Sequence, residues 1–230
     1  MSTNLELVQA LKQETVDSWT VTTVVGQTGE NGRAVKWVKD AWNDLQIDRD
    51  DWRWMRKSFT VNTVASDGAY AYGDCTDTVS SAVITRFTKW HRRTFKCYLS
   101  ASGVGVEYPL IWLEWERFRR LYRYGTQTDG QPVHVSEDPT GAFVLGPKPD
   151  AVYVVSADYQ IGPQVMTADA DVPEMPSQYH NLIMYEAMSR YGGSRIAPEA
   201  MVRAISEGGR LRDALEREQL PKLTYGGALA

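Results

Sequence analysis

Apolar residues recur every three or four positions near both ends of the chain, and this spacing predicts helices there. The clearest case runs from Glu30 to about Asp48, where one side of the helix is apolar and the other is polar. Thr28 stands at the expected N-cap, and Glu30 places a carboxylate in the first turn, which favours the helix dipole. So broad an apolar face needs other helices to cover it. Its residues are Ala34, Val35, Val38, Ala41, Trp42 and Leu45.

Three further segments with helical spacing can cover that face. The first runs from Asn4 to about Val16. Ser177 is a candidate cap for a second helix that is expected to end at Gly192 and Gly193. Pro198 suits the first turn of a last helix, which Pro221 stops. The apolar stripe expected on this last helix contains Met201, Ala204, Ile205, Gly208, Leu211 and Leu215.

From Phe59 onward the period of the apolar positions changes from about 3.6 residues to about 2, which predicts strands. One helix interrupts them at LEWERFRRLYRYG, where Trp115, Phe118, Leu121 and Tyr122 share a face before a closing glycine. The expected strands are Phe59–Val64, Val79–Phe87, Thr94–Leu99, Val133–Glu137, Ala142–Leu145 and Val152–Tyr159.

The order of two helices, a β region and two helices predicts an α+β fold. We expect a four-helix bundle from the N- and C-terminal helix pairs, with an antiparallel β domain inserted between them. The expected boundaries are 1–57 with 173–220 for the discontinuous bundle and 58–172 for the β domain. Residues 221–230 are expected to be a flexible tail.

Composition narrows the class of protein. With 43% hydrophobic residues the 230-residue chain can build a sizeable core, and it contains no apolar stretch long enough to span a membrane. Its amphipathic start does not resemble a signal peptide, so we expect synthesis in the cytoplasm. Cys75 and Cys97 are expected to be buried free thiols. A net charge of −4 argues against non-specific coating of nucleic acid.

The sequence lacks the motifs of common enzymes. His91, His134 and His180 stand apart from one another and from the cysteines, so we expect no metal site. The glycine-rich segment 26–33 lacks the ending of a phosphate-binding loop, and we expect no cofactor. Glu114 and Glu116 are the best carboxylate pair for a glycan hydrolase, but residues two apart on a helix point away from each other. We therefore do not expect an enzyme.

Two runs combine basic and aromatic residues, KWHRRTFK at 89–96 and RFRRLYRY at 117–124. Such runs suit single-stranded nucleic acid or phosphate, and Arg92, Arg93, Arg119 and Arg120 are the candidate contacts. The interpretation we favour is a strand edge and an amphipathic helix whose arginines cover a protein partner, because the chain is acidic overall. Eight tryptophans and twelve tyrosines also suit protein interfaces.

Several segments of the chain are informative as a set: LVQALKQE, VVGQTGE, AVKWVKDAWNDLQ, RDDWRWM, FTKWHRRTFKCY, YPLIWLEWERFRRLYRYG, FVLGPKPDAVYVVSADYQIGPQVM, DADVPEMPSQYHNLIMYEAMSRYGG and REQLP. Together they resemble the head–tail adaptor proteins of tailed phages. These are connector or head-completion proteins related in architecture to tail tubular protein A. The similarity extends over nearly all of the chain up to Pro221.

The resemblance implies a structural protein of the virion neck. Such a protein would form a homo-oligomeric ring, a dodecamer, beneath the portal protein, with a tail or nozzle protein on the other side and a central channel for double-stranded DNA. It implies no catalytic residues, no cofactor and no membrane partner. The segment KLTYGGALA becomes the candidate portal-docking tail, with Leu223, Tyr225 and Leu229 as anchors.

Two alternatives remain open from the sequence. A nucleic-acid-binding phage accessory protein that uses the two arginine-rich runs is the main alternative function. The charged residues of the last helix can serve a seam between ring subunits or form ordinary pairs within the helix. These residues are Arg203, Glu207, Arg210, Arg212, Asp213, Glu216, Arg217 and Glu218.

Overall fold

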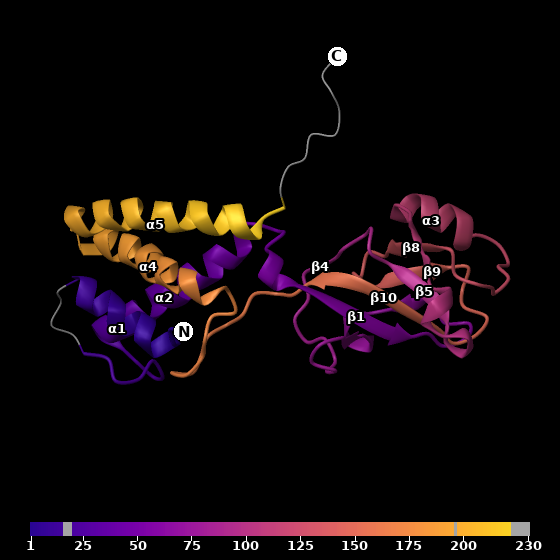
Figure 1. Ribbon diagram of the computed structural model, residues 1–230, viewed down its shortest axis with the longest axis horizontal. Coiled ribbons are helices and arrows are strands. Elements are labelled where there is room, and N and C mark those ends of the chain that lie inside the picture. The colour runs from indigo at the N-terminus through magenta and orange to yellow at the C-terminus, as the bar shows by residue number, and fades with distance from the viewer. Residues whose placement is uncertain (16–19, 196, 222–230) are drawn as a thin grey trace, which may run out of the picture. The chain divides into compact units, whose positions relative to one another are not determined.

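The residues that the computed structural model describes are 1–15, 20–195 and 197–221. They form two compact units, each with its own core (Figure 1). The helical unit contains Met1–Met55 and the chain from Pro163 onward, and the β unit is Arg56–Gly162. Helices and sheets are both well represented, which confirms the α+β class.

The helical unit is organised around α4, which contacts three other long helices. α4 contacts α1, α2 and α5, and α1 also contacts α2. Figure 1 shows α5 running alongside α4. The long helices are α1 (Asn4–Thr15), α2 (Gly29–Ile47), α4 (His180–Arg195) and α5 (Pro198–Gln219), and the 3₁₀ turns are η1 (Arg53–Met55) and η5 (Ser177–Tyr179).

The helix α2 agrees closely with its prediction. Thr28 is the N-cap residue, and each of the six residues predicted for the apolar face is at most 5% exposed. The helix ends at Ile47, next to the predicted end at about Asp48. Trp52 turns back, and its indole Nε1 donates a hydrogen bond to the carbonyl of Leu45 at 3.0 Å. Its ring stacks on Trp54 at a centroid distance of 4.4 Å.

Two predictions about the C-terminal helices were wrong, and close packing explains both. α4 does not stop at Gly192 and Gly193 but continues to Arg195. A Cβ atom on Gly192 would lie only 3.0 Å from the Cβ of Met201, so the missing side chain lets α4 and α5 approach each other. The small residues Ala204 and Gly208 face inward on α5, which turns Ile205 outward.

The β unit contains two sheets. In sheet A the strand order is β3-β1-β10-β5-β6, and β4 also pairs with β10. The longest pairing is antiparallel, between β1 and β10, and its register runs from Arg56 opposite Gln160 to Asn62 opposite Val154. The strands of sheet A are β1 (Arg56–Asn62), β3 (Thr76–Asp77), β4 (Lys89–Trp90), β5 (Lys96–Leu99), β6 (Tyr108–Pro109) and β10 (Tyr153–Gln160).

Sheet B is mixed, so the prediction of a purely antiparallel β domain was wrong. Its order is β2-β9-β8-β7, and β7 runs parallel to β8. Parallel neighbours need a crossover connection, and α3 lies in that connection. The strands of sheet B are β2 (Ala69–Tyr70), β7 (Ile111–Trp112), β8 (His134–Glu137) and β9 (Phe143–Gly146), and α3 spans Trp115–Tyr122.

Aromatic side chains fill the core of the β unit. Phe59 of β1 is fully buried, and its ring centroid lies 4.8–6.2 Å from those of four other aromatic residues. Phe143, one of the four, comes from sheet B, so the cluster joins the two sheets. The other three are Trp90, Phe95 and Tyr159.

The segment Val79–Phe87, predicted as a strand, is mostly a loop. The carboxylate of Asp77 accepts hydrogen bonds from the backbone N–H groups of Val79 and Ser80 at 3.0 and 2.7 Å. This local capture turns the chain, as short polar side chains often do, and leaves Val79 89% exposed. Only an isolated bridge between Thr76 and Val83 remains of the expected pairing.

The helix α3 covers one face of sheet B. Phe118 is 1% exposed and packs with Leu113 and Val144, with Trp115 and Tyr122 beside them. Leu121 was predicted to share this face but is 49% exposed, and Phe118 is the buried residue of the helix.

Candidate interaction surfaces

The most exposed aliphatic surface of a long helix lies on α5. Pro198, Met201, Val202 and Ile205 follow one another at helical spacing, and we call them the α5 patch. Met201 is 40% exposed, Val202 68% and Ile205 62%. Met201 and Ile205 had been predicted to be buried, and the inward position of the small residues explains why they are not. Contiguous apolar surface of this kind marks binding sites.

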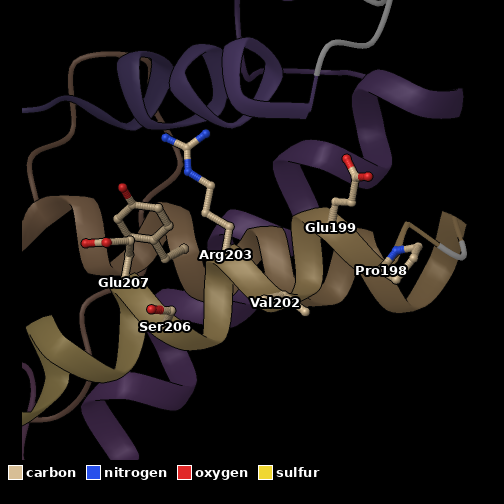
Figure 2. A pocket seen from close by; sticks show the side chains of 7 residues that line it. Pro198, Glu199, Val202, Arg203, Ser206 and Glu207 are labelled. Atoms are coloured by element: carbon tan, nitrogen blue, oxygen red, sulfur yellow. The ribbon is translucent and has the colours of Figure 1, made fainter.

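A groove adjoins the α5 patch (Figure 2). It has a volume of about 580 Å³ and lies between α5 and Tyr185 of α4. Figure 2 shows Glu199, Arg203 and Glu207 projecting from one side of α5. Arg203 forms an ion pair with Glu14 of α1. The groove therefore combines an apolar wall with charged side chains at its rim, as protein interfaces commonly do.

The charged residues of α5 mostly bind other parts of the same unit. This differs from the interpretation of these residues as ordinary pairs within the helix. One pair lies within α5, and the others reach α1, α4 or the residues that follow α2. The pairs are Arg210–Glu207, Arg203–Glu14, Arg212–Glu186, Arg212–Asp48 and Arg49–Glu216.

The first basic-aromatic run reaches the start of α3 through Arg92. Its guanidinium donates a hydrogen bond from Nη1 to Oε1 of Glu114 at 3.1 Å. The same guanidinium lies 5.2 Å above the ring centroid of Trp112. Arg93 is exposed in the turn between β4 and β5. The ion pair means that Arg92 is already partly neutralised.

The second run lies on α3, and both of its candidate arginines are exposed. Arg119 donates a hydrogen bond to the hydroxyl of Tyr124 at 3.3 Å, and its guanidinium lies 5.9 Å from that ring. Arg120 donates from Nε to the carbonyl of Glu116 at 3.4 Å. Glu114 and Glu116 were the carboxylate pair considered for a hydrolase, and Glu114 forms an ion pair with Arg92.

A pocket of about 230 Å³ opens where β7 ends and α3 begins. We call it the Trp112 pocket. Sequence reasoning missed it because its floor comes from β8, and only the parallel pairing of β7 with β8 brings that strand to α3. Its lining residues are Arg92, Trp112, Glu114, Trp115, Ser136, Glu137, Asp138 and Pro139.

The histidines occupy structural positions. Nδ1 of His134 lies 2.7 Å from the hydroxyl of Tyr122. His180 is 1% exposed, and its Nδ1 accepts a hydrogen bond from the backbone N–H of Ser2 at 3.0 Å. Burial lowers the pKa of both imidazoles. Within the described ranges, no three histidine, cysteine or acidic side chains lie where they can hold a metal ion.

Cys75 and Cys97 are buried free thiols, as predicted. Burial raises the pKa of the Cys75 thiol to about 12 and that of Cys97 to about 11. A thiol is a nucleophile only as its thiolate, so neither group has the character of a reactive cysteine.

Two further sequence predictions concern the docking tail and the absence of a membrane span. The candidate docking residues Leu223, Tyr225 and Leu229 lie outside the described residues. In the part of the chain that is described, each helix is too short or too polar to cross a membrane.

An outward-facing apolar helix face and a pocket of aromatic and charged groups are features of a protein that acts by binding other proteins. Residues 2–223 match the family model of the SU10 adaptor protein, and the chain therefore belongs to the SU10 adaptor protein family. This agrees with the resemblance to phage head–tail adaptors and identifies a phage structural adaptor, a component of the virion. No curated protein matches the chain.

Proposed function

We propose that the protein is a head–tail adaptor that forms a homo-oligomeric ring between the portal and the tail of a tailed phage. The family match over residues 2–223 is the observation that carries this proposal. The ring, a dodecamer by resemblance, leaves a central channel through which double-stranded DNA passes. The protein acts by binding its neighbours in the virion and not as an enzyme.

The α5 patch supports an assembly role. A closed ring needs two different complementary faces on each subunit. An exposed aliphatic face beside a groove with a charged rim supplies one such face in the helical unit. We propose that the four long helices act as one bundle that carries this contact and that the β unit is an insertion in it. A neighbouring subunit that covers these aliphatic residues removes apolar surface from water, and this stabilises the ring.

We further propose that the last residues, 221–230, dock on the portal protein. Leu223, Tyr225 and Leu229 are the apolar anchors of this tail. A chain that ends after Leu220 is expected to keep its fold, measured by circular dichroism, but to lose co-sedimentation with purified portal. Normal attachment of this shortened chain would contradict the docking role.

The ring contact is tested separately with Val202→Asp. Val202 is 68% exposed on α5, and Val104 of the β unit is 67% exposed, so Val104→Asp is the matched control. Valine and aspartate have similar helix propensities, so the fold should tolerate the change. We expect Val202→Asp to lower the number of copies on each portal. Equal losses for both variants would contradict a specific role of the α5 patch.

The alternative function is nucleic-acid binding through the arginine-rich runs, and it can be tested with the same purified protein. Salt-dependent binding of the purified protein to a short DNA duplex would favour it. A weaker salt dependence after changing Arg92, Arg93, Arg119 and Arg120 together to glutamine would assign the contact to these runs. For an adaptor whose channel only lets DNA pass, we expect no such binding.

A further inference from the structure

The Trp112 pocket is bounded by three separate parts of the β unit. Trp112 and Glu114 lie on either side of the junction between β7 and α3, and Ser136 and Glu137 come from the end of β8. Arg92 reaches it from the turn after β4. Its volume of about 230 Å³ equals that of roughly eight waters at about 30 Å³ each. This is room for one side chain and part of a main chain.

Two polar atoms of the lining residues lack hydrogen-bond partners among the described residues. They are the hydroxyl of Ser136, a residue with 0% exposure, and the indole Nε1 of Trp112. Buried polar atoms in folded proteins are nearly always paired. An indole N–H only donates, and a hydroxyl both donates and accepts. Both atoms are enclosed, so a ligand at the pocket can pair with them only where the side chains that cover them move.

The charge of the pocket favours a cationic ligand. Three carboxylates, those of Glu114, Glu137 and Asp138, face the single guanidinium of Arg92. Glu114 is engaged by Arg92 at 3.1 Å. The carboxylate of Asp138 stabilises the turn that follows it, because its Oδ1 accepts a hydrogen bond from the backbone N–H of Thr140 at 2.8 Å.

Of the three carboxylates, that of Glu137 is available to bind a cation. Its carboxylate forms no hydrogen bond or ion pair within the part of the chain that the structure describes, although it is partly buried. Burial raises the pKa of Glu137, and the nearby charge of Arg92 opposes the rise. A partly buried carboxylate is stabilised by a positive partner.

The aromatic walls suit the same kind of ligand. The ring of Trp112 already has the guanidinium of Arg92 at 5.2 Å, and indole is the aromatic surface that attracts cations most strongly. Trp115 adds a second, partly exposed indole at the pocket. A phosphate would instead meet three carboxylates and one guanidinium that is already paired, so an anion is disfavoured.

We propose that the Trp112 pocket receives a lysine or arginine side chain from an extended segment of a partner protein. Glu137 is the counter-ion for that side chain, and Trp112 lies beside it in the lining of the pocket. The identity of the partner, another protein of the virion, rests on the proposed function. The binding of a cationic side chain by the pocket does not rest on it, so the proposed function and the proposed binding can fail separately.

The test uses the full-length protein alone and two small probes. N-acetyl-lysine-N′-methylamide carries the cation and two amide groups, and N-acetyl-norleucine-N′-methylamide is its uncharged counterpart. The indole N–H signal of Trp112 is read in ¹H–¹⁵N spectra of the labelled protein and assigned with Trp112→Phe. We expect the lysine probe to shift this signal in a saturable way and the norleucine probe to leave it unchanged.

Two charge variants decide whether the shift reports the proposed contact. Glu137→Gln should weaken binding of the lysine probe by about tenfold, because a hydrogen bond to a charged group is lost. Glu116→Gln makes the same change on an exposed part of α3 and should leave binding unaltered. The proposal is overturned if the signal does not move, if norleucine moves it equally, if both variants behave alike, or if inorganic phosphate moves it instead.

Discussion

Gly146 of β9 provides the sharpest test of how α3 sits on sheet B. A Cβ atom at this position would lie 2.5 Å from Cδ2 of Tyr122 and 2.8 Å from Cε2 of Phe118. Real Cβ atoms do not come so close to other carbon atoms, so Gly146→Ala must push the two rings outward. Tyr122 cannot move without disturbing the 2.7 Å contact between its hydroxyl and His134.

The size of the effect follows from this overlap. Carbon atoms rest about 3.5–4.0 Å apart, so the Tyr122 ring has to move by about 1 Å. Overpacking of this kind costs about 1–3 kcal/mol. At about 4 °C per kcal/mol for a unit of this size, the midpoint of thermal unfolding of the β unit should fall by about 4–12 °C.

The assay is thermal unfolding followed by near-ultraviolet circular dichroism, with Gly105→Ala as the control. Nothing lies within 4 Å of a Cβ atom on Gly105, so alanine there should be neutral or slightly stabilising. The His134 ring signals should also shift in Gly146→Ala and not in the control. If both variants unfold at the temperature of the unchanged protein, α3 does not pack on Gly146 as described.

Three further predictions concern titratable groups. Because burial raises the pKa of Cys75 to about 12 and of Cys97 to about 11, a thiol reagent at pH 8 should label neither cysteine until urea unfolds the protein; rapid labelling of the native protein would contradict this. Burial lowers the pKa of His180, so its contribution to stability is complete above about pH 6.5 and is lost as the pH falls below that value; His180→Gln should flatten this loss in urea titrations. Burial opposes ionisation of Asp158, but hydrogen bonds from Ser58 and Arg56 outweigh it and lower the pKa, so Asp158→Asn should cost more stability at pH 7 than below about pH 4.

Long elements with a clear period could be predicted from the sequence because burial alone specifies them. The face of α2 from Ala34 to Leu45 is buried as its spacing indicated. The alternating residues of the segment Val152–Tyr159 likewise form β10, the strand that pairs with β1. In both cases one surface of the element is apolar, and only one orientation buries it.

Features that depend on another element could not be predicted in the same way. α5 turns the small residues Ala204 and Gly208 inward, which leaves Met201 and Ile205 exposed, and Gly192 of α4 makes room for the Cβ of Met201. β7 has two residues, too few for a pattern, and its parallel pairing is set by the crossover that contains α3. The Trp112 pocket exists only through that pairing, so no local signal in the sequence identifies Ser136 or Glu137.

The copy number of the protein on its portal tests the central claim most directly. Native mass spectrometry of the full-length protein mixed with the purified portal protein of the same phage measures it in one experiment. We predict a complex in which many copies form a closed ring, and we predict that Val202→Asp reduces their number. A single bound copy, or no complex at all, would contradict the account of this protein as a ring-forming adaptor.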